Sequence, residues 1–388
     1  MKKLVFLLPI AALAMASCSN DSVVEQPTTK VVSAEALQIY PELQGITRGT
    51  VWDNGNFAEF KLTTSGTFQE DEETVNATTG TKKFTGETVT KTSGTWGFEG
   101  GTIYYWPSKS YSSNFQAWAP VDVTAGSYTA STTIANQKDI VVAYNEGEAS
   151  TFESGVPLKF RHILSQIIVK ADNADKNEIQ IKVKGIRLNN VATNNTWKLP
   201  TASTVSSLQE DIWTSTPGTN DDYVASITET TLTDGSATDI TGSNPLLLIP
   251  QQLNTADISK TGGAGSEKSG QYLSVLVQIK SGTDWIYPKR QGDGESGYAW
   301  AAVDINTKWE AGKKYIYTLH FTKNGYGKVD GDQGDGGEEK PGSEDPDNPD
   351  PNDPQPGEDI IDTPVKLILD VEVIDWVDGT TANESIDM

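Results

Sequence analysis

The sequence predicts an all-β protein, and three observations support this prediction. Threonine, serine, glycine, valine and isoleucine are plentiful, tryptophan and tyrosine are common, and long helix-forming stretches of leucine, alanine and glutamate are missing. β-Branched and aromatic side chains fit the pleated surface of a sheet. Several segments alternate apolar and polar residues, and short runs of threonine, serine, glycine and asparagine separate them. This texture is typical of β-sandwich domains.

The amino terminus has the pattern of a secretory signal peptide over residues 1–17. A short positive start precedes an apolar run that ends in small residues. The run is too short to span a membrane, which needs roughly 20 apolar residues. Cys18, the only cysteine, follows directly, and residues 13–18 resemble the lipobox of bacterial lipoproteins, with Met15 where leucine is usual.

A lipobox cysteine is acylated and becomes the first residue of the mature protein. We therefore expect Cys18 to carry a lipid anchor with acyl chains such as palmitate. An ordinary signal peptide followed by an unrelated cysteine is the alternative. Residues 18–36 are polar and weakly patterned, so we expect a tether there. About 370 residues remain after cleavage, which is enough for two domains of ordinary size.

The first expected strand lies within KVVSAEALQIY, residues 30–40. The turn-like stretch QGITRG, residues 44–49, follows it and contains Arg48 and Gly49. The strands of the main body come after this stretch. One amino-terminal strand is thus set apart from the body by a flexible segment with a single arginine.

Later segments alternate clearly with a period of two. The clearest are residues 178–188, 272–280, 315–321 and 365–376. In the first of these the apolar face changes side at Gly185, which predicts a β-bulge at that glycine. Residues 158–171 also fit a helical period, but their Ile-Ile-Val end favours a strand.

The segment before the last expected strand differs from the rest of the chain. Residues 325–362 are rich in proline, glycine and acid and offer almost nothing apolar, which predicts a disordered loop. The formal charge of the chain is −23, and thirteen acids and two lysines between 328 and 362 contribute −11 of it. A calcium loop is disfavoured because Gly334 occupies the third ligand position. The last strand therefore reaches its sheet through a long acidic leash.

The sequence offers no site for catalysis, a cofactor or a metal. Its two histidines, His162 and His320, lie in separate strand-like runs, and we interpret His162 as a structural hydrogen-bonded residue. Phosphate-binding and serine-nucleophile motifs are missing, and no basic cluster is dense enough to hold nucleic acid. A secreted hydrolase with two facing carboxylates stays open by default, without a residue that points to it.

Two aromatic clusters have two interpretations. Residues 103–108 and 114–120 supply Tyr104, Tyr105, Trp106, Phe115 and Trp118. If exposed, these rings could stack on sugars; if they alternate inside a sandwich, they form core. We favour core because tyrosine and tryptophan carry large buried areas.

An ordered series of motifs resembles the fimbrillin-like lipoproteins, the type V pilus subunits of Bacteroidetes. The series runs from the lipobox to the carboxyl terminus: YYWP, NFQAWAP, QKDIVVAY, LKFRHILSQIIVKA, LLLIPQ, KWEAGKKYIYTLHF and VEVIDWVDG. The resemblance implies two tandem β-sandwich domains of transthyretin-like topology joined by a short linker. We place them at residues 37–155 and 156–388, with the boundary near Gly155.

The resemblance also implies a mode of assembly. Family members reach the outer membrane as lipoproteins, and a trypsin-like protease then cuts after an arginine and removes the first strand. Arg48 and Gly49 match that cut, and a strand of another subunit would fill the groove. The segment KLILDVEVIDW is a candidate donor, unless it simply closes its own domain.

The leading hypothesis is therefore a structural or adhesive pilus subunit rather than an enzyme. Its expected partners are other pilus subunits, the outer membrane, the processing protease and a host or bacterial surface receptor. A surface carbohydrate-binding lipoprotein of a glycan uptake system is the first alternative. Whether this subunit belongs to shaft, tip or anchor is not decided by the sequence.

Overall fold

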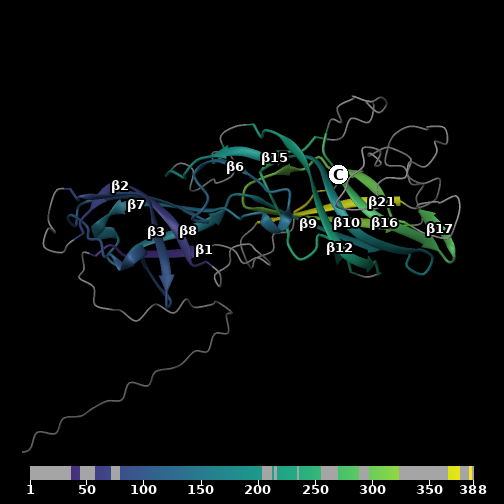
Figure 1. Cartoon of the computed structure of the whole chain (residues 1–388), viewed down its shortest axis with the longest axis horizontal. Helices are drawn as coiled ribbons and strands as arrows, with labels where there is room; N and C mark the ends of the chain where they lie inside the picture. Colours follow the sequence, from purple (N-terminus) through teal and green to yellow (C-terminus); the bar gives the residue numbers. More distant parts are fainter. Residues whose placement is uncertain are drawn as a thin grey trace, which may run out of the picture. The chain divides into compact units, whose positions relative to one another are not determined.

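The computed structural model describes most of the chain after the expected tether (Figure 1). The described residues are 36–43, 57–70, 79–202, 212–213, 216–233, 236–254, 270–287, 297–322, 366–375 and 384–386. Strands dominate this part of the chain, and its only helical elements are three single-turn 3₁₀ segments. The all-β prediction is confirmed. Cys18, Arg48, Gly49 and the acidic segment 325–362 lie outside the described residues.

The first sheet has seven strands in the order β1-β8-β7-β5-β2-β3-β4. Its strands are β1 (Ile39–Leu43), β2 (Glu59–Phe68), β3 (Lys82–Thr92), β4 (Thr95–Phe98), β5 (Ser112–Ala119), β7 (Val141–Glu148) and β8 (Val156–His162). Neighbouring strands are antiparallel except β1, which runs parallel to β8.

Aromatic rings fill the core of this first sheet. Phe68 stacks on Phe84 with centroids 4.9 Å apart, and Trp106 lies 5.2 Å from Phe68 and 5.7 Å from Phe115. Trp118 is also buried and belongs to the second core described below. The interpretation of the aromatic clusters as core is confirmed for Tyr104, Trp106, Phe115 and Trp118, whereas Tyr105 is half-buried.

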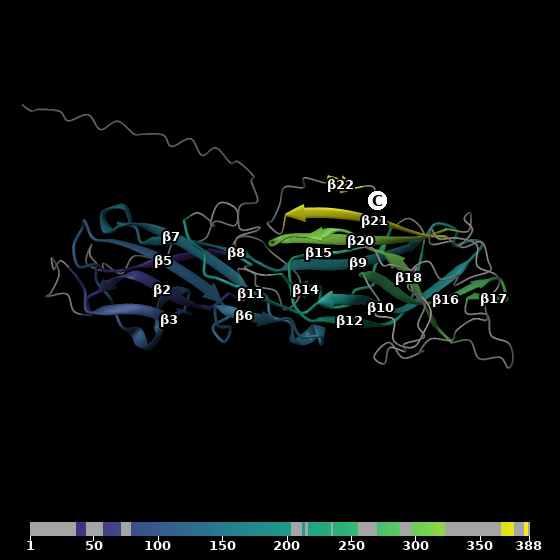
Figure 2. The ribbon, with the colours of Figure 1, turned by 90° about the horizontal axis from the view of Figure 1, so that it is seen from above.

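Two sheets, of five and six strands, form a second body (Figure 2). One has the order β12-β10-β16-β17 with β18 also paired to β16, and the other has the order β13-β9-β20-β21-β22 with β14 also paired to β9. The first comprises β10 (Gln180–Ala192), β12 (Asn220–Thr231), β16 (Tyr272–Ser281), β17 (Asp284–Tyr287) and β18 (Ala299–Asp304). The second comprises β9 (Ser165–Asn173), β13 (Thr238–Asp239), β14 (Leu246–Leu248), β20 (Lys313–Thr322), β21 (Lys366–Asp375) and β22 (Glu384–Ile386). Two small pairs, β6 (Gly126–Thr129) with β11 (Asn194–Trp197) and β15 (Gln251–Gln252) with β19 (Lys308–Trp309), complete the strands.

The predicted alternation fixes which side chains enter the second core. Alternate residues of β10, β16 and β20 are fully buried and form one cluster with those of β9, although in β16 the residues on the other face, 272–278, are buried as well. In β10 the register shifts between Val183 and Gly185, and Val183 and Ile186 are both completely buried. The bulge predicted at Gly185 is therefore confirmed, because an extra residue is needed to keep both apolar runs on the core side.

The strand after Gly155 belongs to the first sheet. β8 pairs with β1 and β7, and its Phe160 lies in the aromatic core of that sheet. Ile163 and Leu164, which follow β8, are buried in the second core. We therefore propose a domain boundary between His162 and Ser165 in place of the predicted one near Gly155. The ambiguous segment 158–171 forms two strands, as favoured, rather than a helix.

Substituting alanine for Gly185 should destabilise the protein by about 1–3 kcal/mol. A Cβ at this position would lie 2.7 Å from the backbone oxygen of Ala225, so β10 and β12 would have to move apart. Chemical denaturation measures the effect, and Gly97→Ala is the matched control, since its Cβ would meet nothing within 4 Å. Equal stability of the two variants would contradict this account of the bulge.

Candidate functional site at the amino-terminal edge strand

The amino-terminal strand β1 lies at the edge of the first sheet and pairs only with β8 among the described strands. The pairing is parallel and runs from Ile39 opposite Val156 to Leu43 opposite Phe160. A parallel edge strand is unusual in an otherwise antiparallel sheet, since parallel pairing needs a long connection. Here that connection is the whole of the first domain between β1 and β8. The strand expected within residues 30–40 is found later in the chain, at Ile39–Leu43, after an isolated bridge at Ala36, and residues 30–35 lie outside the described part.

Three apolar side chains attach β1 to the core. Leu37, Ile39 and Leu43 are each at most 6% exposed and belong to the aromatic core of the first sheet. Tyr40 and Glu42 point the other way and are exposed. Burying a side chain of this size contributes about 1.5–3 kcal/mol. The strand is therefore held by a small number of well-defined contacts.

Without β1, most of β8 would have no strand partner. β7 pairs with β8 only at Arg161 and His162, so in the described part of the chain β1 is the single ladder partner of residues 156–160. On the opposite side of β8, the carbonyl oxygen of Pro157 accepts a hydrogen bond from the Asn145 side chain at 2.7 Å. The backbone of β8 thus depends on β1 on one side and on a side chain on the other.

The alternation of a parallel ladder shows which backbone groups of β8 form hydrogen bonds to β1. The Val156 N–H donates to the Gln38 carbonyl oxygen at 2.8 Å, so Val156, Leu158 and Phe160 direct their N–H and C=O groups towards β1. Pro41 then stands where its missing N–H falls on the outer side of β1 and interrupts no ladder bond. Proline on such an outer edge also discourages indiscriminate strand pairing.

The start of β1 is tied to a second segment of the first domain. Ala36 forms a β-bridge with Tyr105, and the Leu37 N–H donates to the Tyr104 carbonyl oxygen at 2.7 Å. Arg48 follows β1 by five residues in the sequence, and Cys18 precedes it. Both of these candidate sites, and Gly49 with them, remain predictions because they lie outside the described residues.

The candidate donor strand β21 is paired within its own sheet. It aligns with β20 over ten residues, from Lys313 opposite Asp375 to Thr322 opposite Lys366. Val371 is buried, and Leu369 and Val373 pack partly buried against the second core. In this structure the strand therefore closes its own domain, and donation to another subunit remains a proposal.

The two histidines occupy structural positions. His162 and Asp139 are fully buried, with 2.8 Å between Nδ1 and a carboxylate oxygen, so the structural interpretation of His162 is confirmed. His320 lies on β20 between two carboxylates, with Nδ1 2.7 Å from Asp172 and Nε2 3.2 Å from Asp370. It thereby links β9 to β21 across the middle strand. No group of three or more potential metal ligands is placed together among the described residues.

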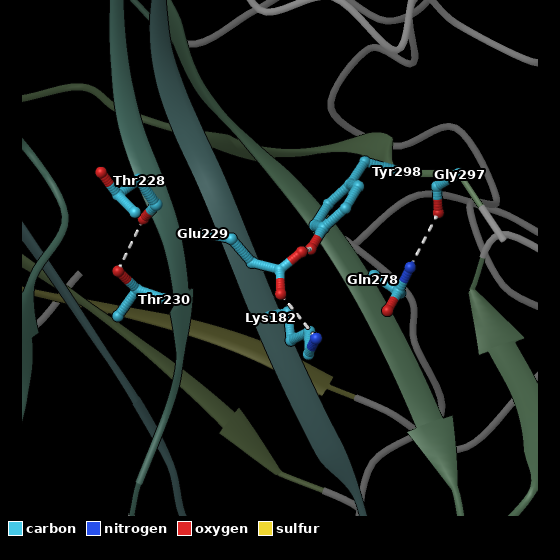
Figure 3. Close-up of polar contacts among 7 residues, drawn as sticks. All are labelled: Lys182, Thr228, Glu229, Thr230, Gln278, Gly297 and Tyr298. Carbon is cyan, nitrogen blue, oxygen red and sulfur yellow. Dashed lines mark hydrogen bonds and ion pairs between the residues drawn. The ribbon is translucent and has the colours of Figure 1, made fainter.

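A polar cluster on the other large sheet was not foreseen from the sequence (Figure 3). Glu229 on β12 lies 2.6 Å from the Lys182 Nζ on β10 and accepts a hydrogen bond from the Tyr298 hydroxyl, which belongs to the segment entering β18. The hydrogen bond from Lys182, followed by that from Tyr298, lowers the pKa of Glu229, and burial raises the pKa of Tyr298. These residues are more than 40 positions apart in sequence, so no local pattern could reveal them. The cluster links β10 and β12 to the segment that enters β18.

Within the described residues, no helix is both long and apolar enough to cross a bilayer.

Comparison with known proteins places this geometry in context. The family model described as Fimbrillin-like matches residues 47–332. No curated protein sequence gives a match. Among solved structures, a fimbrial protein from Bacteroides vulgatus is 15% identical, with 75% of this chain and 96% of that chain covered and a TM-score of 0.49. A candidate cell adhesion protein from Bacteroides uniformis is also 15% identical, with 88% and 99% covered and a TM-score of 0.42.

The Glu229 cluster makes stability depend on pH below neutrality. The folded-state pKa of Glu229 lies below its ordinary value of 4.5, so its contribution is present above that pH and is lost as the pH falls through the folded-state pKa. Glu229→Gln should lower the unfolding temperature at pH 7 by about 2 °C and have a smaller effect at pH 3. Thermal denaturation at both pH values tests this, with the exposed Glu153→Gln as control. An equal deficit for Glu229→Gln at both pH values would refute the linkage.

Proposed function

The chain belongs to the fimbrillin-like family, and on this premise we propose that it is a structural and adhesive subunit of a surface fimbria, assembled when another subunit's strand replaces β1. The observation that carries the proposal is the pairing of β8. Residues 156–160 have β1 as their single described ladder partner, and β1 is an edge strand that can leave without unthreading the fold. A strand from another molecule can dock on such an edge by the same main-chain hydrogen bonds.

The energetics require replacement rather than simple loss. Removing β1 uncovers the sites of Leu37, Ile39 and Leu43 and leaves backbone groups of β8 unpaired. Each backbone hydrogen bond that is exchanged for one to water costs about 0.5–1.5 kcal/mol, and the loss of side-chain burial adds to it. An incoming strand with apolar residues at alternate positions restores both the side-chain burial and the backbone pairing. The exchange therefore links two subunits by contacts that belong to a domain core, which gives a durable joint.

The order of features along the chain suits a single processing event. Cys18, β1 and Arg48 follow one another in sequence, so a cut after Arg48 releases the lipid anchor and frees β1 from the body at once. A trypsin-like protease recognises an arginine of this kind. We further propose that Cys18 holds the precursor at the outer membrane until that cut, at the surface where the subunits assemble.

For the donor, β21 is the strand that the sequence favours. Its apolar residues alternate as a groove along β8 requires, and a long segment of 43 residues, 323–365, separates it from β20. Its donation would break ten residues of pairing with β20 and uncover Val371, so a donor in an assembled fimbria must regain an equal number of contacts. Other partners, including a surface receptor, follow from an adhesive role.

The carbohydrate-binding alternative receives no specific support. It relies on Trp106 and Trp118 as exposed platforms, and these rings are only 4% and 8% exposed. A buried ring packed on other core aromatics is not available to stack on a sugar. The hydrolase alternative also has no residues that point to it.

Arg48→Gln should abolish processing and assembly while leaving the fold intact. The uncut protein would retain β1, so its groove would stay filled and its surface polymer would be lost. Mass spectrometry of the amino terminus, together with polymer ladders on partly denaturing gels, measures both effects. Lys83→Gln, which removes an exposed positive charge from β3, is the control and should be processed normally. Normal polymer with an uncut Arg48→Gln chain would overturn the proposal.

Cys18→Ser should prevent acylation and release the precursor from the membrane. Without the thiol no thioether to lipid can form, so the protein should move from the membrane fraction to the soluble fraction. Fractionation and labelling with a palmitate analogue measure this, and Ser22→Ala serves as the control. A membrane-bound, labelled Cys18→Ser protein would rule out the anchor at this cysteine.

A further inference from the structure

A close contact between β1 and a glycine lies just outside the core. Gly155, the residue before β8, has φ +97°, a conformation that side chains rarely adopt. A Cβ at this position would lie 2.1 and 2.4 Å from two ring carbons of Tyr40 and 3.1 Å from the Cβ of Gln38. The tyrosine ring therefore lies directly against the glycine backbone, where no side chain could fit.

Hydrogen bonds close this contact into a compact unit. The Tyr40 hydroxyl donates to the Gln38 Oε1 at 2.7 Å, and the Val156 N–H donates to the Gln38 carbonyl oxygen at 2.8 Å. The Gly155 N–H donates to the Phe152 carbonyl oxygen at 2.7 Å, which fixes the turn that leads into β8. We call Gln38, Tyr40 and Gly155 the glycine clasp.

The clasp lies on the outward side of β1, where packing in the apolar core does not dictate which residue type is present. Outward positions of an edge strand face solvent and are usually polar, as Glu42 is. Tyr40 is instead one of the two most exposed large hydrophobic residues described, at 39%. The other, Ile103, lies two residues from Tyr105, which bridges to Ala36 at the start of β1. Both residues belong to segments that meet where β1 begins.

We propose that Gly155 is a specificity-determining position of the groove along β8. It selects a strand that presents a flat aromatic ring on its outward side, with a hydrogen-bond acceptor two residues earlier. This inference rests on the proposed strand exchange for its biological role, in which the partner is a strand of a different subunit with that pattern, since β21 of this chain (Lys366–Asp375) contains no aromatic residue. The contact itself is independent of assembly.

The clasp also defines the register of the docked strand. A slip of two residues keeps the apolar face inward but brings Gln38 or Glu42 over Gly155 in place of the ring. The inward face distinguishes these registers in part, since a slip places Pro41 in a site that Ile39 or Leu43 fills. The contact over Gly155 adds to this preference. Because Gly155 has no side chain, the Tyr40 ring can lie against its backbone.

A double-mutant cycle in the full chain tests the clasp by hydrogen exchange of the β8 amides. Tyr40→Ala should speed exchange of the Val156, Leu158 and Phe160 amides by about tenfold, whereas the outward neighbour Glu42→Ala should have little effect. Gly155→Ala should speed it in the parent chain but add clearly less in the Tyr40→Ala background, because the collision with the ring is then gone. Equal effects of Gly155→Ala in both backgrounds would overturn the contact.

Further variants at position 40 test the preference for a flat ring. Tyr40→Phe should keep most of the protection and lose only the hydroxyl bond to Gln38, while Tyr40→Val should exchange as fast as Tyr40→Ala. Protection by valine equal to that by phenylalanine would overturn the selection. Polymer formation is measured separately. If the double-mutant cycle shows coupling between Tyr40 and Gly155 but the protein never polymerises, only the proposed function is rejected. Polymer formation without coupling in the cycle rejects the clasp alone.

Discussion

Backbone pairing along β8 is the constraint on which the first domain depends. Val156, Leu158 and Phe160 are completely buried, and their N–H and C=O groups face β1. Buried backbone groups of this kind must be paired, because water cannot reach them. The three side-chain sites alone, at about 1.5–3 kcal/mol each, are a large share of the stability of a typical domain, which is about 5–15 kcal/mol. Loss of β1 would therefore lower the stability of the first domain substantially, and in the proposed exchange a strand of another molecule restores it.

The floor of this position is formed by residues that do not belong to β1. Phe160 packs on Phe57 and Phe60 with ring centroids 4.9 and 5.0 Å apart, and these rings also contact Trp96. The aromatic layer therefore joins β8 to β2 and β4 whether or not β1 is present. A groove with such a floor keeps its shape for an incoming strand, which lowers the ordering cost of docking.

Local patterns in the sequence predicted much of the fold, but they could not predict which strands pair with one another. The alternation in β10, β16 and β20 and the change of face at Gly185 are written in consecutive residues, so the buried faces and the bulge could be predicted. Whether β8 joins the first or the second sheet depends on strands that are distant in sequence, and its own alternation is the same in either case. The same reason hid the Glu229–Tyr298 contact. Gly155, predicted as a boundary, is instead a contact point for β1.

In the proposed assembly, cutting the chain between β1 and β2 changes how strongly β1 competes for its site. While the chain is intact, β1 is held near β8 at an effective concentration on the order of millimolar, so a strand from another subunit rarely succeeds. After a cut, β1 that leaves is diluted, and a neighbouring subunit on the same surface becomes the better competitor. The proposed exchange would then proceed in one direction without an energy source. A strand held by three buried side chains and an external clasp suits this step, since it is firm enough to protect the precursor and weak enough to be replaced.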